Sequence, residues 1–513
     1  MHTKIFSATP LGVSAHQVDV EVDLSIGMLQ FHIVGLPDTA IKESKQRIST
    51  ALKNSGIRLP EKKITVNLAP ADLKKEGTVF DMPIAIGIVQ AAHLITISAA
   101  FIQETLFLGE LSLDGSINSV KGVLPIAYDA KKLGKKRIIL PEANAQEAAL
   151  IQDLEVIGVK SLTHLIGFLR NEYTIAPTQG AWFTQMQHTP SPLDFAHVKG
   201  QEQAKRALQI AATGRHNILF IGPPGSGKTM LAKRLPSIMP TMSFNELIET
   251  SKVYSISGKL NYQNLVMERP FRNPHHTISQ AGLIGGGTQP QPGEVSLAHH
   301  GILFLDELTE FRRTTLEVLR QPLENKNVSI ARANNTLDFP ANFLLVAALN
   351  PCPCGFYGDK KRSCSCSYQQ INKYIEKLSG PLLDRIDLQV PVQSIDYEEA
   401  ISKEANKPSS ADLMVAINKA IATQQQRFNS DAFFNSMMTS EQIEAYCALT
   451  PPAQELIKKA FDKLHLTMRG YHKILKVART IADLDSADII DSKHIQEAIM
   501  YRSLDQFIER QNR

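Results

Sequence analysis

Hydrophobic and polar residues alternate near the start of the chain, in a pattern typical of a half-buried β-strand. The apolar positions of this run are Val18, Val20, Val22 and Leu24, and side chains two residues apart lie on one face of a strand. A second strand is predicted over residues 63–68. These elements predict a first domain that mixes α and β structure.

A long uncharged apolar stretch follows, over residues 84–102. Its length is close to that of a helix that crosses a bilayer, which needs roughly 20 apolar residues. Polar residues interrupt it at Gln90, His93, Thr96 and Ser98. The stretch therefore predicts a helix buried inside a domain, and we expect no membrane association.

Three short apolar runs in the middle of the chain alternate with helical segments. They cover residues 217–221, 301–305 and 343–349. Continuous apolar runs of this length are typical of strands in a parallel sheet whose two faces are both covered by helices. The pattern predicts a doubly wound α/β core.

After Ser394 the apolar residues recur every three or four positions, which predicts a helical domain at the end of the chain. The positions that carry this spacing are Leu413, Ile417, Ile421, Leu456, Ala460, Leu464, Ile474, Val477 and Ile481. Ser492 is a candidate N-cap for a final helix.

Proline and glycine separate the first two regions. Pro177, Gly180, Pro190 and Pro192 lie among polar residues, a composition typical of a linker. The fold class predicted is α/β and multidomain, because a chain of 513 residues with 43% hydrophobic content is too long for a single core. The expected parts are an α+β N-terminal domain, a linker, an α/β core and a helical domain, over residues 1–175, 176–192, 193–394 and 395–513.

Charge and cysteine content exclude several classes of protein. The chain has 55 basic and 51 acidic residues, for a formal net charge of +4. Composition alone therefore does not indicate nucleic-acid binding, although a local basic surface is compatible with it. Five cysteines in the whole chain exclude a disulfide scaffold and favour a reducing compartment. The chain starts with mixed polar sequence and no long apolar segment, so we expect a cytoplasmic protein.

The apolar run at residues 217–221 leads into a loop with the phosphate-binding pattern GxxxxGK[ST]. Its residues are Gly222, Pro223, Pro224, Gly225, Ser226, Gly227, Lys228 and Thr229. The glycines let backbone N–H groups close on phosphate oxygens, the lysine neutralises the β and γ phosphates, and the threonine hydroxyl is a ligand for Mg²⁺. A strand, this loop and a helix in that order predict a site for ATP and Mg²⁺.

Acidic and polar side chains follow the other two predicted strands. Asp306 and Glu307 come directly after residues 301–305, where the first suits Mg²⁺ coordination and the second suits positioning of an attacking water. Asn350 follows the third strand and could hydrogen-bond the same water or the γ phosphate. An acidic start of an exposed helix and an asparagine turn are the structural alternatives.

Four of the five cysteines form two Cys-x-Cys pairs that enclose nine residues. They are Cys352, Cys354, Cys364 and Cys366. Four thiolates suit tetrahedral Zn²⁺, so we predict a structural zinc loop over residues 352–366, with a reduced loop without metal as the alternative. Basic residues between the pairs also make the loop a candidate DNA contact, through Lys360, Lys361 and Arg362.

Together these motifs resemble the AAA+ ATPases, and within them the magnesium-chelatase-like group that contains the ComM/YifB proteins. The resemblance covers essentially the whole chain. Besides the phosphate loop it rests on five further segments, which are residues 34–38 (VGLPD), 66–72 (VNLAPAD), 109–111 (GEL), 271–276 (FRNPHH) and 476–480 (KVART).

The resemblance implies a role for each residue of the predicted ATP site. Lys228 and Thr229 would belong to the Walker A motif, Asp306 and Glu307 to the Walker B motif, and Asn350 would be sensor 1.

Two arginines complete the set of residues that the resemblance implies. Arg385 would be an arginine finger that reaches the nucleotide of a neighbouring subunit, and an ordinary ion pair with Asp384 or Asp387 is the alternative. Arg469 resembles sensor 2, with Arg479 as a rival. A finger that acts on a neighbour implies a homo-hexameric ring with ATP at the subunit interfaces.

Members of this group carry two insertions in the ATPase core, which would be residues 272–293 and 326–338 here. In a ring such loops would point into the channel and grip a DNA strand. The alternative is an ordinary solvent-exposed excursion. The candidate DNA contacts in these loops are Arg272, His275, His276 and Arg332.

The N-terminal region resembles the catalytic domain of the Lon protease, of the S5 type, with two departures. Val79 stands where the protease pattern has a nucleophilic serine, and Leu124 lies near the position of its lysine partner. Neither side chain can attack a peptide bond or activate a nucleophile. We therefore expect no peptidase activity, and a role in DNA binding or assembly instead.

The function that the resemblance implies is an ATP-driven, hexameric DNA motor. Such a branch-migration helicase would act on recombination intermediates and promote the integration of donor DNA in natural transformation. Its partners would be single-stranded and branched DNA, with a recombinase or other recombination proteins. The alternative is a protein-remodelling or metal-chelatase-type ATPase that acts on a protein. The long N-terminal region favours the motor, because the chelatase subunit usually lacks it.

Overall fold

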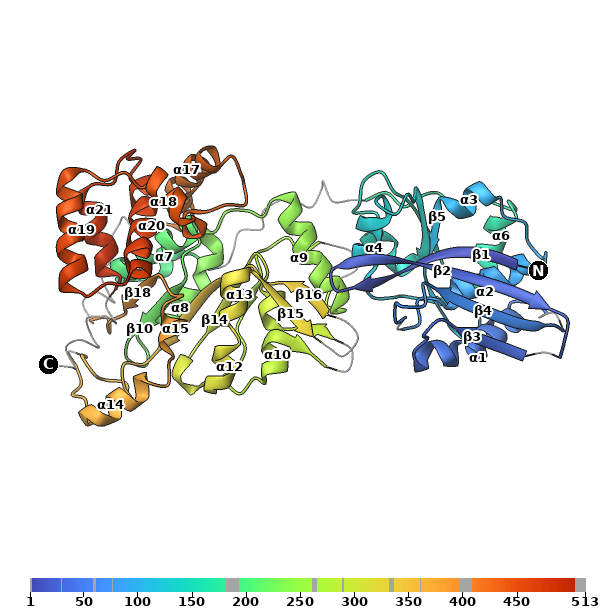
Figure 1. Cartoon of the computed structure of the whole chain (residues 1–513), viewed down its shortest axis with the longest axis horizontal. Helices are drawn as coiled ribbons and strands as arrows, with labels where there is room; N and C mark the ends of the chain where they lie inside the picture. The colour runs from blue at the N-terminus through green and yellow to red at the C-terminus, as the bar shows by residue number, and fades with distance from the viewer. Residues whose placement is uncertain are drawn as a thin grey trace. The chain divides into compact units, whose positions relative to one another are not determined.

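The computed structural model describes residues 2–28, 30–58, 61–75, 77–180, 193–260, 265–287, 290–331, 336–359, 361–396 and 408–502. The chain forms two compact units, each assembled from several stretches (Figure 1). Unit 1 consists of Met1–His188, Phe244–Met267 and Ser329–Phe339, and unit 2 of Thr189–Ser243, Glu268–Val328 and Pro340–Arg513. Much of the predicted linker, residues 181–192, lies outside the described residues.

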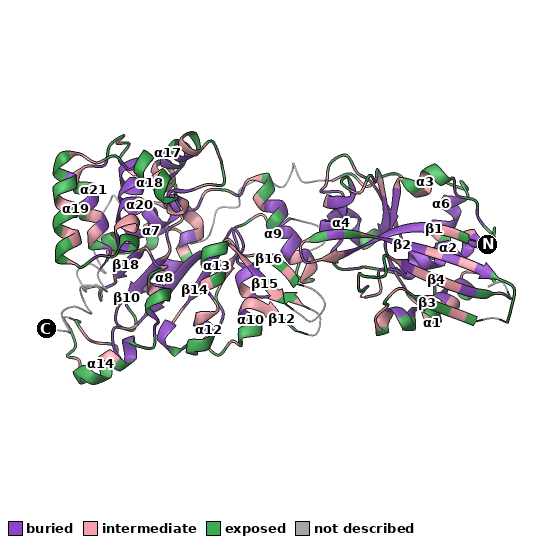
Figure 2. Cartoon of the chain, viewed as in Figure 1, coloured by how far each residue is buried: buried purple, intermediate pink, exposed green. Residues whose placement is uncertain are grey.

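Unit 1 is built on a four-stranded sheet with the order β1-β2-β4-β3. Its strands are β1 (His2–Leu11), β2 (Ser14–Ser25), β3 (Gln30–Val34) and β4 (Lys63–Ala69). β2 is antiparallel to both β1 and β4, and β3 runs parallel to β4. The alternating apolar residues of β2 are all buried, as Figure 2 shows for this strand. The predicted half-buried strand is confirmed.

The long apolar helix predicted over residues 84–102 is confirmed only in its first part. α2 (Asp81–Ala91) is buried along nearly its whole length. The chain then turns at His93, whose φ is +57°, a value outside the helical region. Ser98 caps a separate short helix, α3 (Ala99–Gln103), by accepting a backbone hydrogen bond. The prediction of one continuous helix was wrong, because the interrupting polar residues end one helix and start the next.

A parallel three-stranded sheet, β5-β8-β9, is the second sheet of unit 1. A short antiparallel hairpin of β6 and β7 and a helix α1 complete this part of the unit. The strands and helices are α1 (Thr39–Asn54), β5 (Thr105–Phe107), β6 (Glu110–Leu111), β7 (Ile117–Asn118), α4 (Val123–Ala130), β8 (Arg137–Pro141), α5 (Glu142–Ala148), β9 (Glu155–Val159) and α6 (Leu162–Leu169).

Two later stretches of the chain also belong to unit 1. α9 (Phe244–Ile256) packs on α4. In that contact the Lys252 ammonium lies 3.6 Å from the centre of the Tyr128 ring. Ser255 of α9 also reaches α5, where its hydroxyl donates to the Glu147 carboxylate at 2.5 Å. The other stretch, residues 329–339, comes from the hairpin formed by β15 (Asn327–Ala331) and β16 (Thr336–Pro340).

Unit 2 is built on a five-stranded parallel sheet with the order β11-β14-β17-β10-β18. The strands are β10 (Ile218–Ile221), β11 (Phe271–Arg272), β14 (Ile302–Leu305), β17 (Leu344–Leu349) and β18 (Leu388–Pro391). Helix α7 (Glu202–Gly214) packs against β10 and β18, and α8 (Lys228–Arg234) against β17. β10, β14 and β17 are the three predicted apolar runs, each one residue shorter at its start. The parallel sheet is confirmed.

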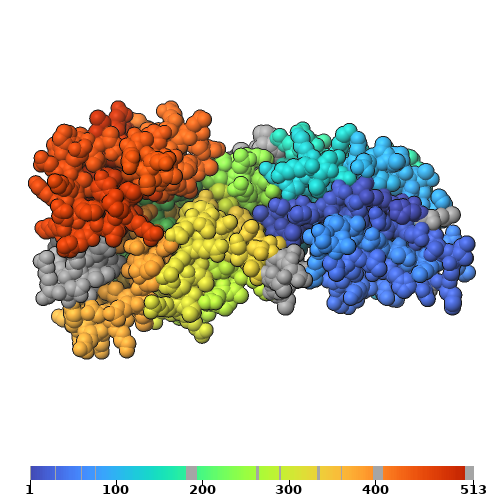
Figure 3. Space-filling model, in the orientation of Figure 1, coloured from blue at the N-terminus to red at the C-terminus, as the bar shows by residue number. Residues whose placement is uncertain are grey.

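The last part of unit 2 is helical, and Figure 3 shows its atoms in red. Its helices are α17 (Ser410–Phe428), α18 (Ser440–Tyr446), α19 (Pro451–Lys463), α20 (Met468–Leu484) and α21 (Ser492–Met500). Ile474, Val477 and Ile481 of α20 are buried, as their helical spacing predicts. Of the helices in the described residues, none combines the length and apolarity that crossing a membrane requires.

The final helix begins one residue away from the predicted cap. The N-cap of α21 is Asp491, whose side chain accepts a hydrogen bond from the N–H of Ser492. The N–H of Asp491 in turn donates to the His494 ring at 2.9 Å, which closes a capping box. The assignment of Ser492 as N-cap was therefore wrong, because an aspartate one position earlier satisfies the same orphan amides.

Candidate nucleotide-binding site

The phosphate loop joins β10, an inner strand of the sheet between β17 and β18, to the N-terminus of α8. Gly225 and Gly227 adopt φ values of +77° and +94°, which only glycine takes up without strain. A Cβ on Gly222 would lie 2.0 Å from the carbonyl oxygen of Val392, just beyond strand β18. Glycine is therefore required at the base of the loop as well as at its turns, and the loop ends at a helix N-terminus that favours phosphate.

The Lys228 ammonium lies at the centre of the site. It donates to the carbonyl oxygens of Gly222 and Pro223 at 2.7 and 2.9 Å and to Asn350 Oδ1 at 3.2 Å. Burial lowers the pKa of Lys228 to about 8, although the nearby carboxylates of the acidic pair oppose this shift. The predicted Walker A lysine and sensor 1 asparagine thus meet, from residues 122 positions apart.

A hydroxyl and a carboxylate meet beside this lysine. Thr229 Oγ1 donates to Asp306 Oδ2 at 2.7 Å, which joins the start of α8 to the end of β14. Mg²⁺ prefers hard oxygen ligands and is held in nucleotide sites by one or two protein oxygens together with phosphates and waters. The two side chains therefore fit a Mg²⁺ ion, which would polarise the phosphates when bound with ATP.

Glu307 is held in an unusual backbone conformation, with φ of +53°. Its carboxylate is 58% exposed and lies 3.6 Å from Nδ1 of His276. The rings of His275 and His276 lie 4.1 Å apart. His276 was predicted to contact DNA, and sequence reasoning missed its approach to Glu307, because the two residues come from different elements.

Arg385 follows the short helix α15 (Gly380–Leu383), with Asp384 between them. It pairs with the Glu324 carboxylate and donates to the Pro381 carbonyl. These contacts do not include an ion pair with Asp384 or Asp387, which was the predicted alternative.

Asp387 has other partners. Its carboxylate lies 3.2 Å from the His216 ring and 3.5 Å from the Lys473 ammonium. Although burial raises the pKa of Asp387, these two groups hold it well below its ordinary value. The Asp387 carboxylate is therefore ionised and pairs with His216 and Lys473, whereas Arg385 pairs with Glu324.

The two rivals for sensor 2 lie in different environments. Arg479 is 1% exposed and its guanidinium bonds Asp483 at 3.0 Å and the backbone oxygens of Ala487 and Asp488. Arg469 lies in the first turn of α20 and is exposed. Arg479 is thus engaged in contacts inside the helical part of unit 2, whereas Arg469 is accessible to solvent.

The remaining candidate DNA residues differ in what holds them. Arg272 forms two hydrogen bonds to the Glu294 carboxylate, at 2.6 and 2.8 Å. Lys361 pairs with Asp396 at 2.8 Å, and the Arg362 guanidinium lies 5.1 Å from the centre of the Phe356 ring. Arg332 and Lys360 lie outside the described residues.

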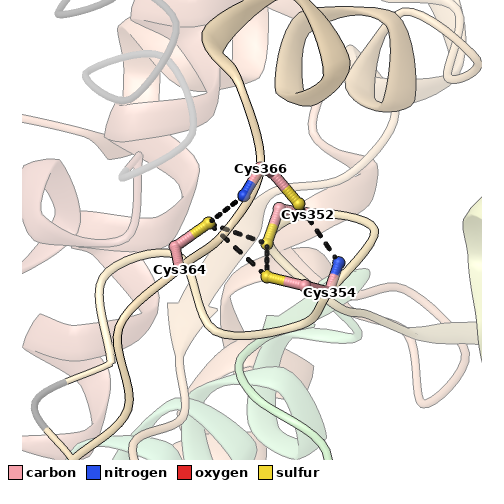
Figure 4. A group of neighbouring side chains, drawn as sticks. All are labelled: Cys352, Cys354, Cys364 and Cys366. Carbon is pink, nitrogen blue, oxygen red and sulfur yellow. Dashed lines mark hydrogen bonds between the residues drawn. The ribbon is translucent and has the colours of Figure 1, made fainter.

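The four clustered cysteines converge in one loop, with their sulfur atoms turned toward one another (Figure 4). Cys352 Sγ lies 3.3 Å from Cys354 Sγ and 3.6 Å from Cys364 Sγ, and Cys354 Sγ lies 3.5 Å from Cys364 Sγ. All four sulfurs, that of Cys366 included, lie within 4.8 Å of one another. Zn–S bonds of about 2.3 Å in a tetrahedron place sulfurs about 3.8 Å apart, so the cluster fits a zinc ion.

One thiol of the cluster is set up to ionise. Backbone N–H groups of Phe356 and Ser365 lower the pKa of Cys354 to about 5, and thiolates are the form that binds metals. None of the four cysteines is in a disulfide.

In unit 1, Val79 and Leu124 are both buried, with exposed fractions of 7% and 0%. These are the positions where the Lon pattern would have a serine and, nearby, its lysine. An apolar side chain inside the core cannot supply a nucleophile or a base.

A phosphate loop that follows an inner parallel strand, with an acidic pair and an asparagine after two other strands of the same sheet, defines a P-loop α/β protein. Residues 194–400 match the family described as "Magnesium chelatase, subunit ChlI". Residues 20–144 match "Subunit ChlI of Mg-chelatase", and residues 407–502 match "Magnesium chelatase, subunit ChlI C-terminal".

Full-length relatives narrow the family further. The chain is 42% identical over 510 residues to "Competence protein ComM" of Haemophilus influenzae, which covers 99% of this chain and 98% of that protein. It is 39% identical over 508 residues to "Uncharacterized protein YifB" of Escherichia coli, which covers 98% and 97%. The chain belongs to the ComM/YifB family of magnesium-chelatase-like AAA+ proteins.

A third similarity is confined to a small part of the chain. "Lon protease 2" of Bacillus subtilis is 31% identical over 127 residues, which is 24% of this chain and 22% of that protein. The expected likeness to Lon is therefore partial.

Proposed function

We propose that the chain binds ATP with Mg²⁺ and hydrolyses it. The observation that carries this proposal is the meeting of Lys228, Thr229, Asp306 and Asn350 at the carboxyl ends of three adjacent parallel strands. The backbone N–H groups of residues 222–229 would bind the phosphates, Lys228 would neutralise their charge, and Thr229 and Asp306 would hold Mg²⁺.

The hydrolytic step needs a residue that orients and deprotonates water. The exposed Glu307 carboxylate suits this role, because it follows the proposed Mg²⁺ ligand directly and reaches into solvent. Asn350 would hydrogen-bond the same water or the γ phosphate. We expect Lys228→Ala to lose nucleotide binding, and Glu307→Gln to bind ATP but hydrolyse it very slowly.

We further propose that the active form is a hexameric ring, in which Arg385 completes the site of a neighbouring subunit and Arg469 acts as sensor 2. Family membership supports this assembly. The exposure of Arg469 supports its proposed role as sensor 2, since a residue that contacts a bound nucleotide must be accessible.

On this basis we propose a DNA motor in the cytoplasm, a branch-migration helicase that promotes integration of donor DNA in natural transformation. The support is the printed name of a 42% identical relative, "Competence protein ComM". The loops that carry Arg272, His275, His276, Lys361 and Arg362 would grip single-stranded or branched DNA, and recombination proteins would be partners. The loop of four cysteines would hold a structural zinc ion.

A second candidate function has its own support. All three matching families are described as parts of magnesium chelatase, and such an ATPase would act on a protein partner instead of DNA.

The deciding measurement is the rate of ATP hydrolysis by the full chain with and without single strands, forks and four-way junctions. The motor predicts a several-fold stimulation by DNA, with branched DNA at least as effective as single strands. Glu307→Gln is the matched control for contaminating activity. A rate that no DNA changes would remove the motor and leave the protein-directed ATPase.

A further inference from the structure

The cysteine loop lies directly against the phosphate loop. Gly355 closes a tight turn in which its N–H donates to the carbonyl oxygen of Cys352 at 2.9 Å. A Cβ built on Gly355 would lie 2.6 Å from Cδ and 2.9 Å from Cγ of Pro224. The backbone of Gly355 therefore packs on the proline ring of the phosphate loop, at a distance that leaves no room for a side chain.

This contact involves the exposed tip of the phosphate loop. The residue after the tip, Ser226, is held by the Gln201 side chain, which donates to its carbonyl oxygen at 3.3 Å. The base of the loop is fixed, because Gly222 lies against Val392 and Lys228 holds two loop carbonyls. Pro224 and Gly225, at the tip, are exposed. Around the position of a Cβ on Gly225 there is open space. The packing of Gly355 on Pro224 is therefore a contact with an otherwise exposed turn.

The cysteine loop lies next to the nucleotide site, and its own cysteines hold the segment that contacts Pro224. Only Pro351 separates Cys352 from Asn350, so the cysteine loop starts directly after the asparagine that follows β17. Cys354, the neighbour of Gly355, lies within 3.5 Å of both Cys352 and Cys364 through its sulfur. The sulfur cluster thus fixes the segment that presses on Pro224.

We propose that Gly355 is a positioning residue for the nucleotide, and that the cysteine loop braces the tip of the phosphate loop so that its N–H groups face the triphosphate. A loop already held in its binding conformation loses less conformational entropy when the ligand arrives. The proposal rests on the ATP site proposed above. It requires neither DNA binding nor a zinc ion in the cluster.

Gly358 provides a matched control within the same loop. Its φ of +77° is close to the +87° of Gly355, so alanine strains the backbone similarly at both positions. A Cβ on Gly358 would meet nothing within 4 Å. The two alanine variants therefore differ in the contact with Pro224.

The test is the dissociation constant of the full chain for a fluorescent N-methylanthraniloyl ATP with Mg²⁺, measured at equilibrium without DNA. We expect Gly355→Ala to bind at least fivefold more weakly than wild type, and Gly358→Ala to bind within twofold of it. The two alanine variants should have thermal unfolding temperatures that are lowered by similar amounts relative to wild type. Equal affinities of the two alanine variants would overturn the proposal.

A compensating change separates positioning from general destabilisation. Pro224→Ala removes the Cδ and Cγ atoms that the new methyl group would meet, so the double variant Pro224→Ala/Gly355→Ala should recover part of the lost affinity. A double variant no better than the product of the two single losses counts against the brace.

Two further outcomes are distinguishable. If Gly355→Ala fails to fold, Pro224→Ala alone tests the contact from the other side. Binding at least twofold weaker than wild type then supports the brace, and unchanged binding overturns it. If wild type itself binds no nucleotide, the proposed ATPase function fails together with the brace, whereas equal binding by wild type and all variants removes the brace alone.

Discussion

Lys228 is held between two opposing influences on its charge. Burial lowers its pKa to about 8, and Asp306 and Glu307 favour the protonated form. A triphosphate brings further negative charge to the ammonium and raises its pKa in the complex. Nucleotide binding is therefore linked to uptake of a proton when the pH is above about 8.

The first prediction follows from this linkage. The affinity for ATP·Mg²⁺ should change little up to about pH 7, be about twofold lower by about pH 8, and fall by up to about tenfold per pH unit well above that, because the free protein must first protonate Lys228. Calorimetry at pH 8.5 in buffers of different ionisation enthalpy should report uptake of a fraction of a proton. A dissociation constant that stays flat to pH 9.5 would show that the lysine remains charged in the free protein.

Lys228 and Arg385 together show which contacts of a single residue the sequence predicts and which it does not. The phosphate loop is contiguous, so its pattern alone indicates which side chains meet the phosphates. The partner of Arg385 is Glu324, 61 positions earlier, and no local spacing joins them. Contacts of this kind depend on tertiary packing, and a single sequence carries no signal for them.

The cysteine loop gives a prediction at the scale of an element. Protein purified without chelator should contain close to one equivalent of zinc, because four thiols lie within the spacing of a tetrahedral site. Cys364→Ala should lose most of the metal. Cys447→Ala is the matched control, since Cys447 is buried in the helical group and outside the cluster. Less than about a tenth of an equivalent in wild type would exclude a resident zinc ion.

The last helix gives a second prediction at this scale. Asp491→Ala removes the N-cap of α21 and a hydrogen bond from Thr450 at 3.0 Å. We expect a loss of about 1 kcal/mol in the free energy of unfolding. Ser492→Ala, one position later, should cost about 0.5 kcal/mol or less. Urea denaturation of the two variants compares them, and an equal loss would contradict the assignment of Asp491 as the cap.

Elements differ in how well their sequences predict them. β10, β14 and β17 were predicted to within one residue because a buried parallel strand is a short apolar run with sharp ends. The helix over residues 84–102 was extended too far, because an uncharged stretch hides the turn at His93. Apolar composition sets burial, and a backbone turn inside an apolar stretch has a much weaker signature.

The proposed hexameric ring gives a prediction at the scale of the whole molecule, which concerns the subunit on which Arg385 acts. Arg385→Ala should preserve nucleotide binding and abolish hydrolysis, and Lys228→Ala should lose binding. If the arginine acts on a neighbouring subunit, mixing the two inactive variants should restore part of the hydrolysis, because some interfaces then join an intact phosphate loop to an intact arginine. The measurement is the hydrolysis rate across mixing ratios. No recovery at any ratio would place Arg385 outside the neighbour's site.

Unit 1 draws on three separate stretches of the chain, the last of which ends at Phe339. A ribosome completes the first stretch, through His188, about 150 residues before it reaches that point. At roughly 5–20 residues per second this interval lasts on the order of ten to thirty seconds. Until α9 emerges, the face of α4 that carries Tyr128 has no partner from that helix. The contacts of the N-terminal unit are therefore complete only late in synthesis, after β10, β11 and β14 of unit 2 have been made.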